Sequence, residues 1–172
     1  MSLCRNFIVE NLCWNNEYRA RHSTPALILS PKLCDHAQQW ANHLANINAL
    51  YYCGRNFNFG QNIFCCPETS LYIDLSGQEV ATYWYQSLKR YDYNKPSNLL
   101  HTNINTGPFT QIIWANSKYF GAAKSISRVG KIFVVAYYYP PGNIIGEYER
   151  NVLPPMCEEK EVSRPPSENS NK

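Results

Sequence analysis

Three segments of the chain carry apolar side chains at helical spacing, and each predicts a helix. The first covers residues 4–22. One of its stripes is formed by Phe7, Asn11, Trp14 and Tyr18. The second continues to about Leu50 and opens with Ser30-Pro31, a pair that suits an N-cap and a first helical turn. The third opens at Asp74 or Ser76. Its stripe consists of Val80, Trp84, Leu88 and Tyr91.

Three further segments predict strands. Residues 61–66 lead into Pro67, and residues 120–127 and 131–139 flank the turn Arg128-Val129-Gly130. The run from Ile132 to Ala136 is continuously apolar, as expected of a strand buried on both faces. Helices first and a hairpin last predict a mixed α/β domain.

A dense apolar block lies between the third helix and the hairpin, in residues 107–117. Asn103 or Thr106 suits the N-cap of a short helix here, and Pro108 suits its first turn. The buried face then consists of Phe109, Ile112, Ile113 and Trp114. By itself this pattern is typical of a core helix.

Composition favours one folded domain. With 44% apolar residues in 172, the chain can fill a single core. We expect the domain to cover residues 1–156 and the charged residues 157–172 to be disordered. Glu10 and Asn11 interrupt the stretch where a signal peptide is continuously apolar. We therefore expect a protein made in the cytosol, with export by a route that needs no signal peptide left open.

The seven cysteines are an odd number, and we expect reduced thiols in that compartment. Cys4 has two interpretations, a palmitoylated anchor or an ordinary thiol, and we prefer the second. His36 and His43 lie about 10.5 Å apart along one helix, which is too far for one metal ion.

The positive charge is concentrated in residues 93–146, which contain five basic residues and no acid. The five are Lys95, Lys118, Lys124, Arg128 and Lys131. They predict either a surface that contacts anionic membranes or scattered solvated charge, and the sequence does not choose between the two. Nucleic acid is a less suitable partner, because the cations do not cluster and no recognised module is present.

Two motifs resemble the signatures of the CAP superfamily (cysteine-rich secretory proteins, antigen 5 and pathogenesis-related 1). Residues 107–114 read GPFTQIIW, with Pro108 where the family has histidine, and residues 138–144 read YYPPGNI. Ala136 stands where secreted members have a disulfide cysteine. Residues 77–81 and 151–155 are similar to the intracellular Golgi-associated branch. The resemblance implies the CAP (SCP, venom allergen-like) fold, a three-layer α-β-α sandwich with a mixed, largely antiparallel central sheet.

The resemblance also implies a cleft in which two histidines and two acids hold a divalent metal. These positions fall here on Tyr52, Gln61, Glu79 and Pro108, and only Glu79 keeps the family's residue type. We therefore expect a degenerate cleft with no metal and no cofactor, in which Glu79 hydrogen-bonds to a neighbour such as Tyr52 or Gln61. His101 is the nearest substitute ligand, and one histidine with one carboxylate makes a poor zinc site.

Function is expected to be binding rather than catalysis. Some CAP proteins bind sterol or fatty acid, and the matching loop here contains Tyr91, Tyr93, Pro96, Leu99 and Leu100. The loop suits lipid contact at the surface, and the alternative is that its aromatic residues pack on the core. It also resembles a motif proposed for caveolin binding. A second hypothesis is a self-associating scaffold at intracellular membranes such as the Golgi.

A hydrolase is the least favoured interpretation, because both cleft histidines are replaced. Cys53 and His101 could imitate a catalytic pair only if the fold brought them together.

Overall fold

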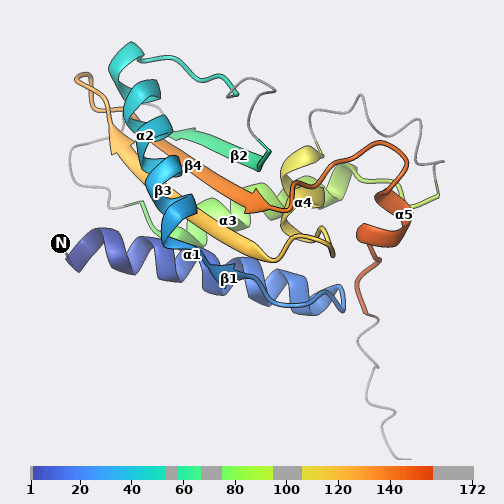
Figure 1. The fold of residues 1–172 in the computed structure, drawn as a ribbon. Coiled ribbons are helices and arrows are strands. Elements are labelled where there is room, and N and C mark those ends of the chain that lie inside the picture. Colours follow the sequence, from blue (N-terminus) through green and yellow to red (C-terminus); the bar gives the residue numbers. More distant parts are fainter. Residues whose placement is uncertain (1, 53–57, 67–74, 95–105, 157–172) are drawn as a thin grey trace, which may run out of the picture.

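The computed structural model describes residues 2–52, 58–66, 75–94 and 106–156. Within these ranges the chain forms helices and four strands (Figure 1). In chain order the elements are α1 (Ser2–Arg21), β1 (Ile28–Leu29), α2 (Pro31–Ile47), β2 (Gly60–Cys66), α3 (Gly77–Tyr85), the 3₁₀ helix η1 (Gln86–Arg90), α4 (Gly107–Ile112), β3 (Tyr119–Ile126), β4 (Ile132–Tyr139) and α5 (Tyr148–Asn151).

The strands form one mixed sheet in the order β1-β3-β4-β2. β1 runs parallel to β3, whereas β3 and β2 are both antiparallel to β4. β4 is a central strand with core side chains packed on both faces of the sheet, and Phe133 to Ala136 are at most 1% exposed. The prediction of a strand buried on both faces is confirmed.

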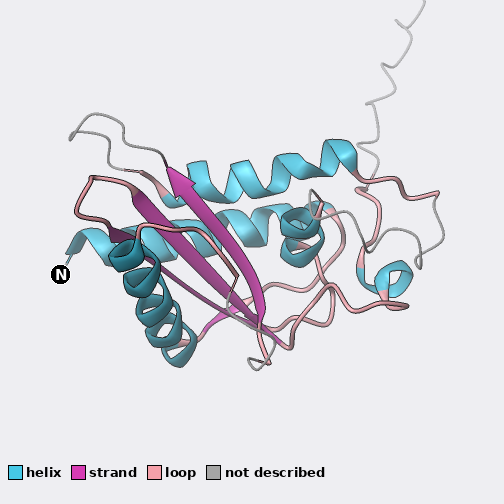
Figure 2. Cartoon of the chain, turned by 90° about the horizontal axis from the view of Figure 1, so that it is seen from above, coloured by secondary structure: helices cyan, strands magenta, loops and turns pink. Residues whose placement is uncertain are grey.

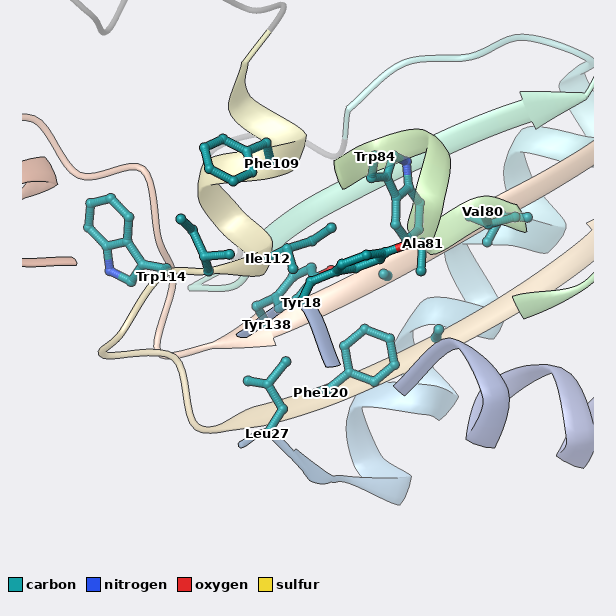
Figure 3. Close-up of a cluster of buried hydrophobic side chains, with 14 of the residues drawn as sticks. Tyr18, Leu27, Val80, Ala81, Trp84, Phe109, Ile112, Trp114, Phe120 and Tyr138 are labelled. Atoms are coloured by element: carbon teal, nitrogen blue, oxygen red, sulfur yellow. The ribbon is translucent and has the colours of Figure 1, made fainter. Parts of the chain in front are cut away.

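Helices cover both faces of the sheet, which makes three layers. α2 packs on one face, and α1, α3 and α4 lie on the other (Figure 2). The predicted three-layer α-β-α sandwich is therefore the observed fold. The larger core cluster lies between the sheet and α1, α3 and α4. Ten of its residues, among them Trp84, Phe109 and Tyr138, are labelled in Figure 3.

The helix starts follow the predicted caps. The Ser30 hydroxyl accepts from the Leu33 N–H, with Pro31 in the first turn of α2. Ser76 caps α3 by the same geometry. Thr106 is the N-cap residue of α4 but makes no side-chain capping bond, whereas Asn103 lies outside the described residues.

The third predicted helix is wrong in its second half. We expected one stripe to continue to Tyr91, but α3 ends at Tyr85 and the chain continues as η1. The Ser87 hydroxyl donates to the Trp84 carbonyl at 2.8 Å. An α-helix would use that carbonyl for the next turn, and a side-chain donor of this kind competes with it. The tighter winding that follows sets the direction of residues 86–90.

Helix α1 confirms the predicted helix and its stripe, and it also buries polar side chains that the sequence did not single out. Phe7, Asn11 and Tyr18 are buried, and Trp14 is partly buried against the core. A polar row of Asn11, Asn15 and Arg19, continued by His22 just after the helix, is fully buried. Each of these side chains has hydrogen-bond partners, which burial requires.

Arg19 connects α1 to the segment that follows α4. Its guanidinium donates to the carbonyls of Ile112 at 2.7 Å, Trp114 at 2.9 Å and Ser117 at 2.9 Å, and also to that of Pro25 at 2.7 Å. Burial lowers the pKa of Arg19 to about 10, so the side chain stays charged at neutral pH. Three of these four bonds fix the C-terminal side of α4, and thereby the position of its first turn.

Among the described residues, no helix combines the length and apolar character needed to cross a membrane. The predicted division at residue 156 stays a prediction, because residues 157–172 lie outside the described part of the chain.

Candidate functional site

A pocket of about 360 Å³ lies where α3 and η1 pass the β2 edge of the sheet. It is lined by Tyr52, Ile63, Tyr83, Trp84, Gln86, Ser87, Lys89, Arg90 and Pro108. Two of the four predicted cleft residues, Tyr52 and Pro108, are therefore brought together here.

The other two predicted cleft residues do not line this pocket. Gln61 lies on β2, and its amide donates to the Tyr137 hydroxyl at 3.3 Å. Tyr137 belongs to the core under α2, so Gln61 faces the opposite side of the sheet from α3. Glu79 is exposed in the first turn of α3, where its carboxylate accepts from the N–H and hydroxyl of Ser76. The expected hydrogen bond of Glu79 is thus made to its own capping box, with Ser76 as the partner.

The back wall of the pocket is held rigidly. The Trp84 indole N–H donates to the Ile63 carbonyl at 3.2 Å, which joins α3 to the edge strand. The Asn62 amide donates to the Pro108 carbonyl at 3.0 Å, and the Phe109 N–H donates to the Ser87 hydroxyl at 3.1 Å. These bonds join α3, β2, η1 and α4 around the pocket.

The mouth of the pocket is polar and basic. Lys89 and Arg90 are both exposed, and so are the phenols of Tyr52 and Tyr83, at 49% and 60%. The Tyr83 ring packs edge-on against Phe64, with 4.9 Å between the ring centroids. Desolvation, followed by the nearby Tyr83, raises the pKa of Tyr52, so its hydroxyl stays a neutral donor at physiological pH.

This chemistry does not fit a divalent cation. Zinc needs imidazole, thiolate or carboxylate ligands. The residues lining the pocket include none of these groups and do include two cations. Across the described residues, no group of three or more His, Cys, Asp or Glu side chains is positioned to hold a metal ion. His101 and Cys53, the alternative ligand and nucleophile, lie outside the described residues.

The predicted lipid loop is described only at its start. Tyr91 is partly buried and packs edge-on against Phe109 at 5.6 Å, and Tyr93 packs on Tyr91 at 4.7 Å. The Tyr93 hydroxyl donates to the Leu153 carbonyl. Desolvation raises the pKa of both tyrosines, that of Tyr91 to about 12. These contacts match the packing alternative for Tyr91 and Tyr93. Lys95, Pro96, Leu99 and Leu100 lie outside the described residues.

The basic residues of the 93–146 segment that the structure describes lie far apart. Lys118 and Arg128 are exposed at opposite ends of β3, separated by roughly 25 Å of strand. Lys124 turns toward α1, where it donates to the Leu75 carbonyl and lies 4.8 Å from the centre of the Phe7 ring. Lys131 is half-buried beside the turn. This placement corresponds to scattered charge. The basic pair that the structure does bring together, Lys89 and Arg90, was not singled out from the sequence.

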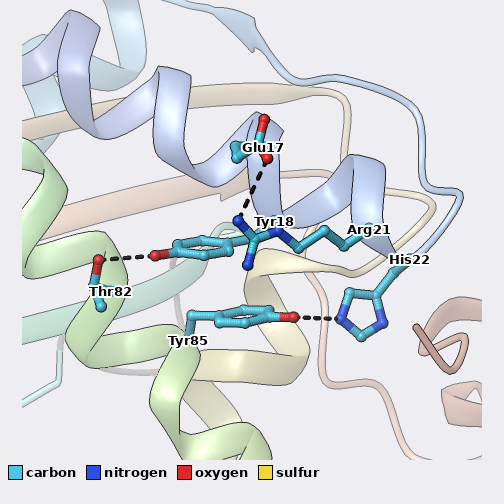
Figure 4. Close-up of polar contacts among 6 residues, drawn as sticks. All are labelled: Glu17, Tyr18, Arg21, His22, Thr82 and Tyr85. Atoms are coloured by element: carbon cyan, nitrogen blue, oxygen red, sulfur yellow. Dashed lines mark hydrogen bonds and ion pairs between the residues drawn. The ribbon is translucent and has the colours of Figure 1, made fainter. Parts of the chain in front are cut away.

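Stacked side chains of α1 and α3 form a cluster next to the helix that lines the pocket (Figure 4). Tyr18 and Tyr85 stack at 3.9 Å, and Tyr18 shares a hydrogen bond of 2.8 Å with Thr82. His22 donates from Nδ1 to the Leu153 carbonyl, so its Nε2 accepts from the Tyr85 hydroxyl at 2.9 Å. Burial lowers the pKa of His22, which favours this neutral form. The cluster thus joins α1, α3 and the C-terminal segment.

The described cysteines are apart from the pocket. Cys13, Cys34 and Cys65 have free thiols, and burial raises the pKa of Cys34 and Cys65. A raised pKa disfavours the reactive thiolate.

Comparisons with known proteins agree with the fold. Residues 15–138 match the family model described as CAP, cysteine-rich secretory protein family. The chain is 35% identical over 164 residues to Golgi-associated plant pathogenesis-related protein 1 from Homo sapiens, covering 90% of this chain and 97% of the relative. It is 32% identical over 162 residues to Repressed by EFG1 protein 1 from Candida albicans, covering 87% of this chain and 55% of that relative.

Solved structures show the same architecture at low sequence identity. NaASP2, whose crystal structure was determined with Zn²⁺, superposes with a TM-score of 0.67 at 17% identity, covering 85% of this chain and 84% of that one. BmVAL-1 superposes with a TM-score of 0.64 at 19% identity, covering 83% of this chain and 79% of that one.

Proposed function

Since the chain belongs to the CAP family, the cysteine-rich secretory protein family, we propose that it is a non-catalytic domain that binds lipid at membrane surfaces. The observation that carries this proposal is the mouth of the pocket, where exposed aromatic rings and exposed cations occur together.

Tyr52 and Tyr83 each combine an apolar ring with a polar tip, a combination that favours the boundary between lipid and water. Lys89 and Arg90 line the same pocket, and each basic residue near an anionic surface contributes about 1 kcal/mol of attraction. The apolar stems of both side chains can lie along the interface while their charges stay solvated.

The pocket offers little for hydrolysis. A hydrolase needs a nucleophile activated by a base, or a metal-bound water. Ser87 carries the aliphatic hydroxyl of the pocket lining. This hydroxyl already donates to the Trp84 carbonyl and accepts from the Phe109 N–H. No imidazole or carboxylate lines the described pocket to serve as its base. This supports binding as the function.

The proposed location comes from a similar protein. The human relative is named as a Golgi-associated protein, and we propose a similar peripheral association for this chain. Sterol is the further candidate ligand, held by the loop that begins at Tyr91. The loop also resembles a motif proposed for caveolin binding, so a caveolin-like membrane protein is a candidate partner.

Co-sedimentation with vesicles tests the proposal. We expect binding to phosphatidylcholine vesicles that contain phosphatidylserine, and weaker binding without it. The double variant Tyr52→Ser, Tyr83→Ser should lose most of this binding. The control Lys118→Gln, Arg128→Gln removes two exposed cations elsewhere and should bind like the wild type. Equal loss in both variants, or no binding by the folded wild type, would refute the proposal.

The sterol component is tested with labelled cholesterol. The suitable variant is Leu99→Ala, Leu100→Ala, because substitution of Tyr91 would disturb its packing on Phe109. Saturable binding that is lost in this variant supports the loop as the sterol site, and binding that is unchanged removes the loop from the proposal.

A second candidate, self-association, is favoured by a different surface. Ile28, Tyr119 and Tyr139 are paired in register across β1, β3 and β4, and are 61%, 42% and 43% exposed. In-register neighbours point to the same face of a sheet, so the three form one apolar row. Sedimentation velocity of the wild type and of Tyr119→Ser tests this candidate. A dimer that dissociates in the variant supports it, and a monomeric wild type at high concentration contradicts it.

A further inference from the structure

The pocket at the β2 edge contains two of the four positions at which the resemblance places metal ligands, and its charged lining residues are both cations. Tyr52 and Pro108 line it where the resemblance places histidines, and Lys89 and Arg90 line it as well. A divalent cation would meet two positive charges and no anionic ligand among the lining residues. A pocket with cationic lining residues favours an anionic ligand.

Both cations are available for a ligand. Lys89 and Arg90 make no hydrogen bond or ion pair with other side chains in the described part of the chain. They are consecutive residues of the short helix η1, so their positions on the backbone are fixed relative to the pocket wall. A concavity that presents two uncompensated cations concentrates anions from solution.

The remaining polar groups of the pocket are donors as well. The phenols of Tyr52 and Tyr83 can donate, and so can the amide of Gln86. Arg90 has the planar fork that binds two oxygens of one phosphate, and Lys89 supplies a point charge. Two cations together balance a phosphomonoester, which carries a charge of about −1.5 to −2 at pH 7.

The exposed aromatic rings of the pocket offer apolar surface beside the cations. Tyr52 and Tyr83 line the pocket and are 49% and 60% exposed, whereas Trp84 is 1% exposed and belongs to the wall. A volume of about 360 Å³ can hold more than a phosphate group alone. The pocket therefore combines exposed aromatic rings with a cationic mouth.

We propose that this pocket binds the phosphomonoester group of an amphiphilic ligand, with Arg90 and Lys89 on the phosphate and the exposed rings of Tyr52 and Tyr83 against the apolar portion. The proposal rests on the proposed lipid function for the lipid source of that phosphate, and a soluble phosphomonoester is the other source.

Isothermal titration calorimetry with glycerol 3-phosphate is the direct test. The wild type should give a saturable 1:1 isotherm, and Lys89→Gln, Arg90→Gln should weaken binding at least tenfold. The control Lys118→Gln, Arg128→Gln should bind like the wild type, and circular dichroism should show all three proteins folded. Absence of saturable binding by the wild type, or equal binding by the Lys89→Gln, Arg90→Gln variant, would overturn the proposal.

A pH comparison separates a phosphate site from general positive charge. Lowering the pH from 7.5 to 5.5 protonates a phosphomonoester, whose second pKa is about 6, but not sulfate. Binding of glycerol 3-phosphate should therefore weaken several-fold, while binding of sulfate should stay unchanged. An equal decrease for both anions would contradict dianion recognition by the pocket.

Vesicles that contain phosphatidic acid separate this inference from the proposed function. Pocket-dependent binding to these vesicles and to glycerol 3-phosphate supports both. Binding of glycerol 3-phosphate without vesicle binding supports the phosphate site and refutes the lipid function. Vesicle binding that is unaffected by the Lys89→Gln, Arg90→Gln variant refutes the phosphate site and leaves the lipid function standing.

Discussion

Replacing Arg19 by methionine should destabilise the fold strongly, because this buried guanidinium makes four hydrogen bonds to backbone carbonyls. Methionine keeps the length and apolar character of the side chain but donates nothing. Hydrogen bonds to a charged group contribute about 1.5–3 kcal/mol each, which would total roughly 6–12 kcal/mol if they were additive. The variant regains part of this, because several kcal/mol of desolvation of the charge is no longer required. We therefore expect a net loss of about 3–5 kcal/mol in the free energy of unfolding.

Urea unfolding followed by circular dichroism measures this loss. For an m-value of about 2 kcal/mol per molar urea, the midpoint should fall by roughly 2 M. Arg21→Met is the matched control, because Arg21 is exposed and makes only surface contacts, an ion pair at 3.4 Å with Glu17 and a cation–π contact at 5.2 Å with the Tyr18 ring. Such surface pairs contribute about 0.3–0.5 kcal/mol. A midpoint shift below about 0.5 M for Arg19→Met would refute the interpretation of Arg19 as the residue that fixes α4.

Three further predictions test how the site is held in place. Gly77→Ala should destabilise by about 2–4 kcal/mol in urea unfolding, because the added Cβ would lie 2.3 Å from the Phe7 carbonyl, whereas Gly107→Ala, with 3.6 Å to its nearest neighbour, should change stability by less than about 1 kcal/mol. Burial lowers the pKa of His22 in the folded protein, so the unfolded chain protonates this imidazole first as the pH falls. The free energy of unfolding should therefore decrease below about pH 6.5. His22→Gln should flatten this dependence between pH 7.5 and 5, and an unchanged pH profile would contradict the prediction. Ser76→Ala removes the capping box of α3 and should lower the free energy of unfolding by about 1 kcal/mol. An unchanged urea midpoint would contradict this prediction.

The order of elements could be predicted because the signals were local. Ser30 and Ser76 start helices through bonds to their own first turns, and the apolar run of β4 reflects burial on both faces. The two signature motifs then placed the chain in its family, and with it the three layers.

The buried polar stripe of α1 could not be predicted in the same way. Asn15 and Arg19 are buried because their partners, such as Tyr138 and the carbonyl of Ile112, come from distant parts of the chain. Hydrophobic periodicity does not register polar groups that are satisfied over long sequence separations. The predicted stripe of α1 was therefore correct, but the buried polar residues beside it were missed.

The basic pair at the pocket was missed for a geometric reason. Extending one α-helix to Tyr91 gives Leu88 a place on the buried stripe and treats Lys89 and Arg90 as solvated ends. The change to η1 after Tyr85 alters which way these residues point, and no glycine or proline marks it. The residue types expected for a metal site also directed attention to Glu79, which serves as a helix cap.

Hydrogen–deuterium exchange of the protein with and without vesicles that contain phosphatidic acid tests the central claim most directly. We expect slower exchange in residues 83–94, the segment that carries Tyr83, Lys89 and Arg90 of the pocket lining, and little change along β3 and β4. Protection confined to the row of Ile28, Tyr119 and Tyr139, or none in residues 83–94 while vesicles are bound, would contradict the assignment of the pocket as the membrane-facing site.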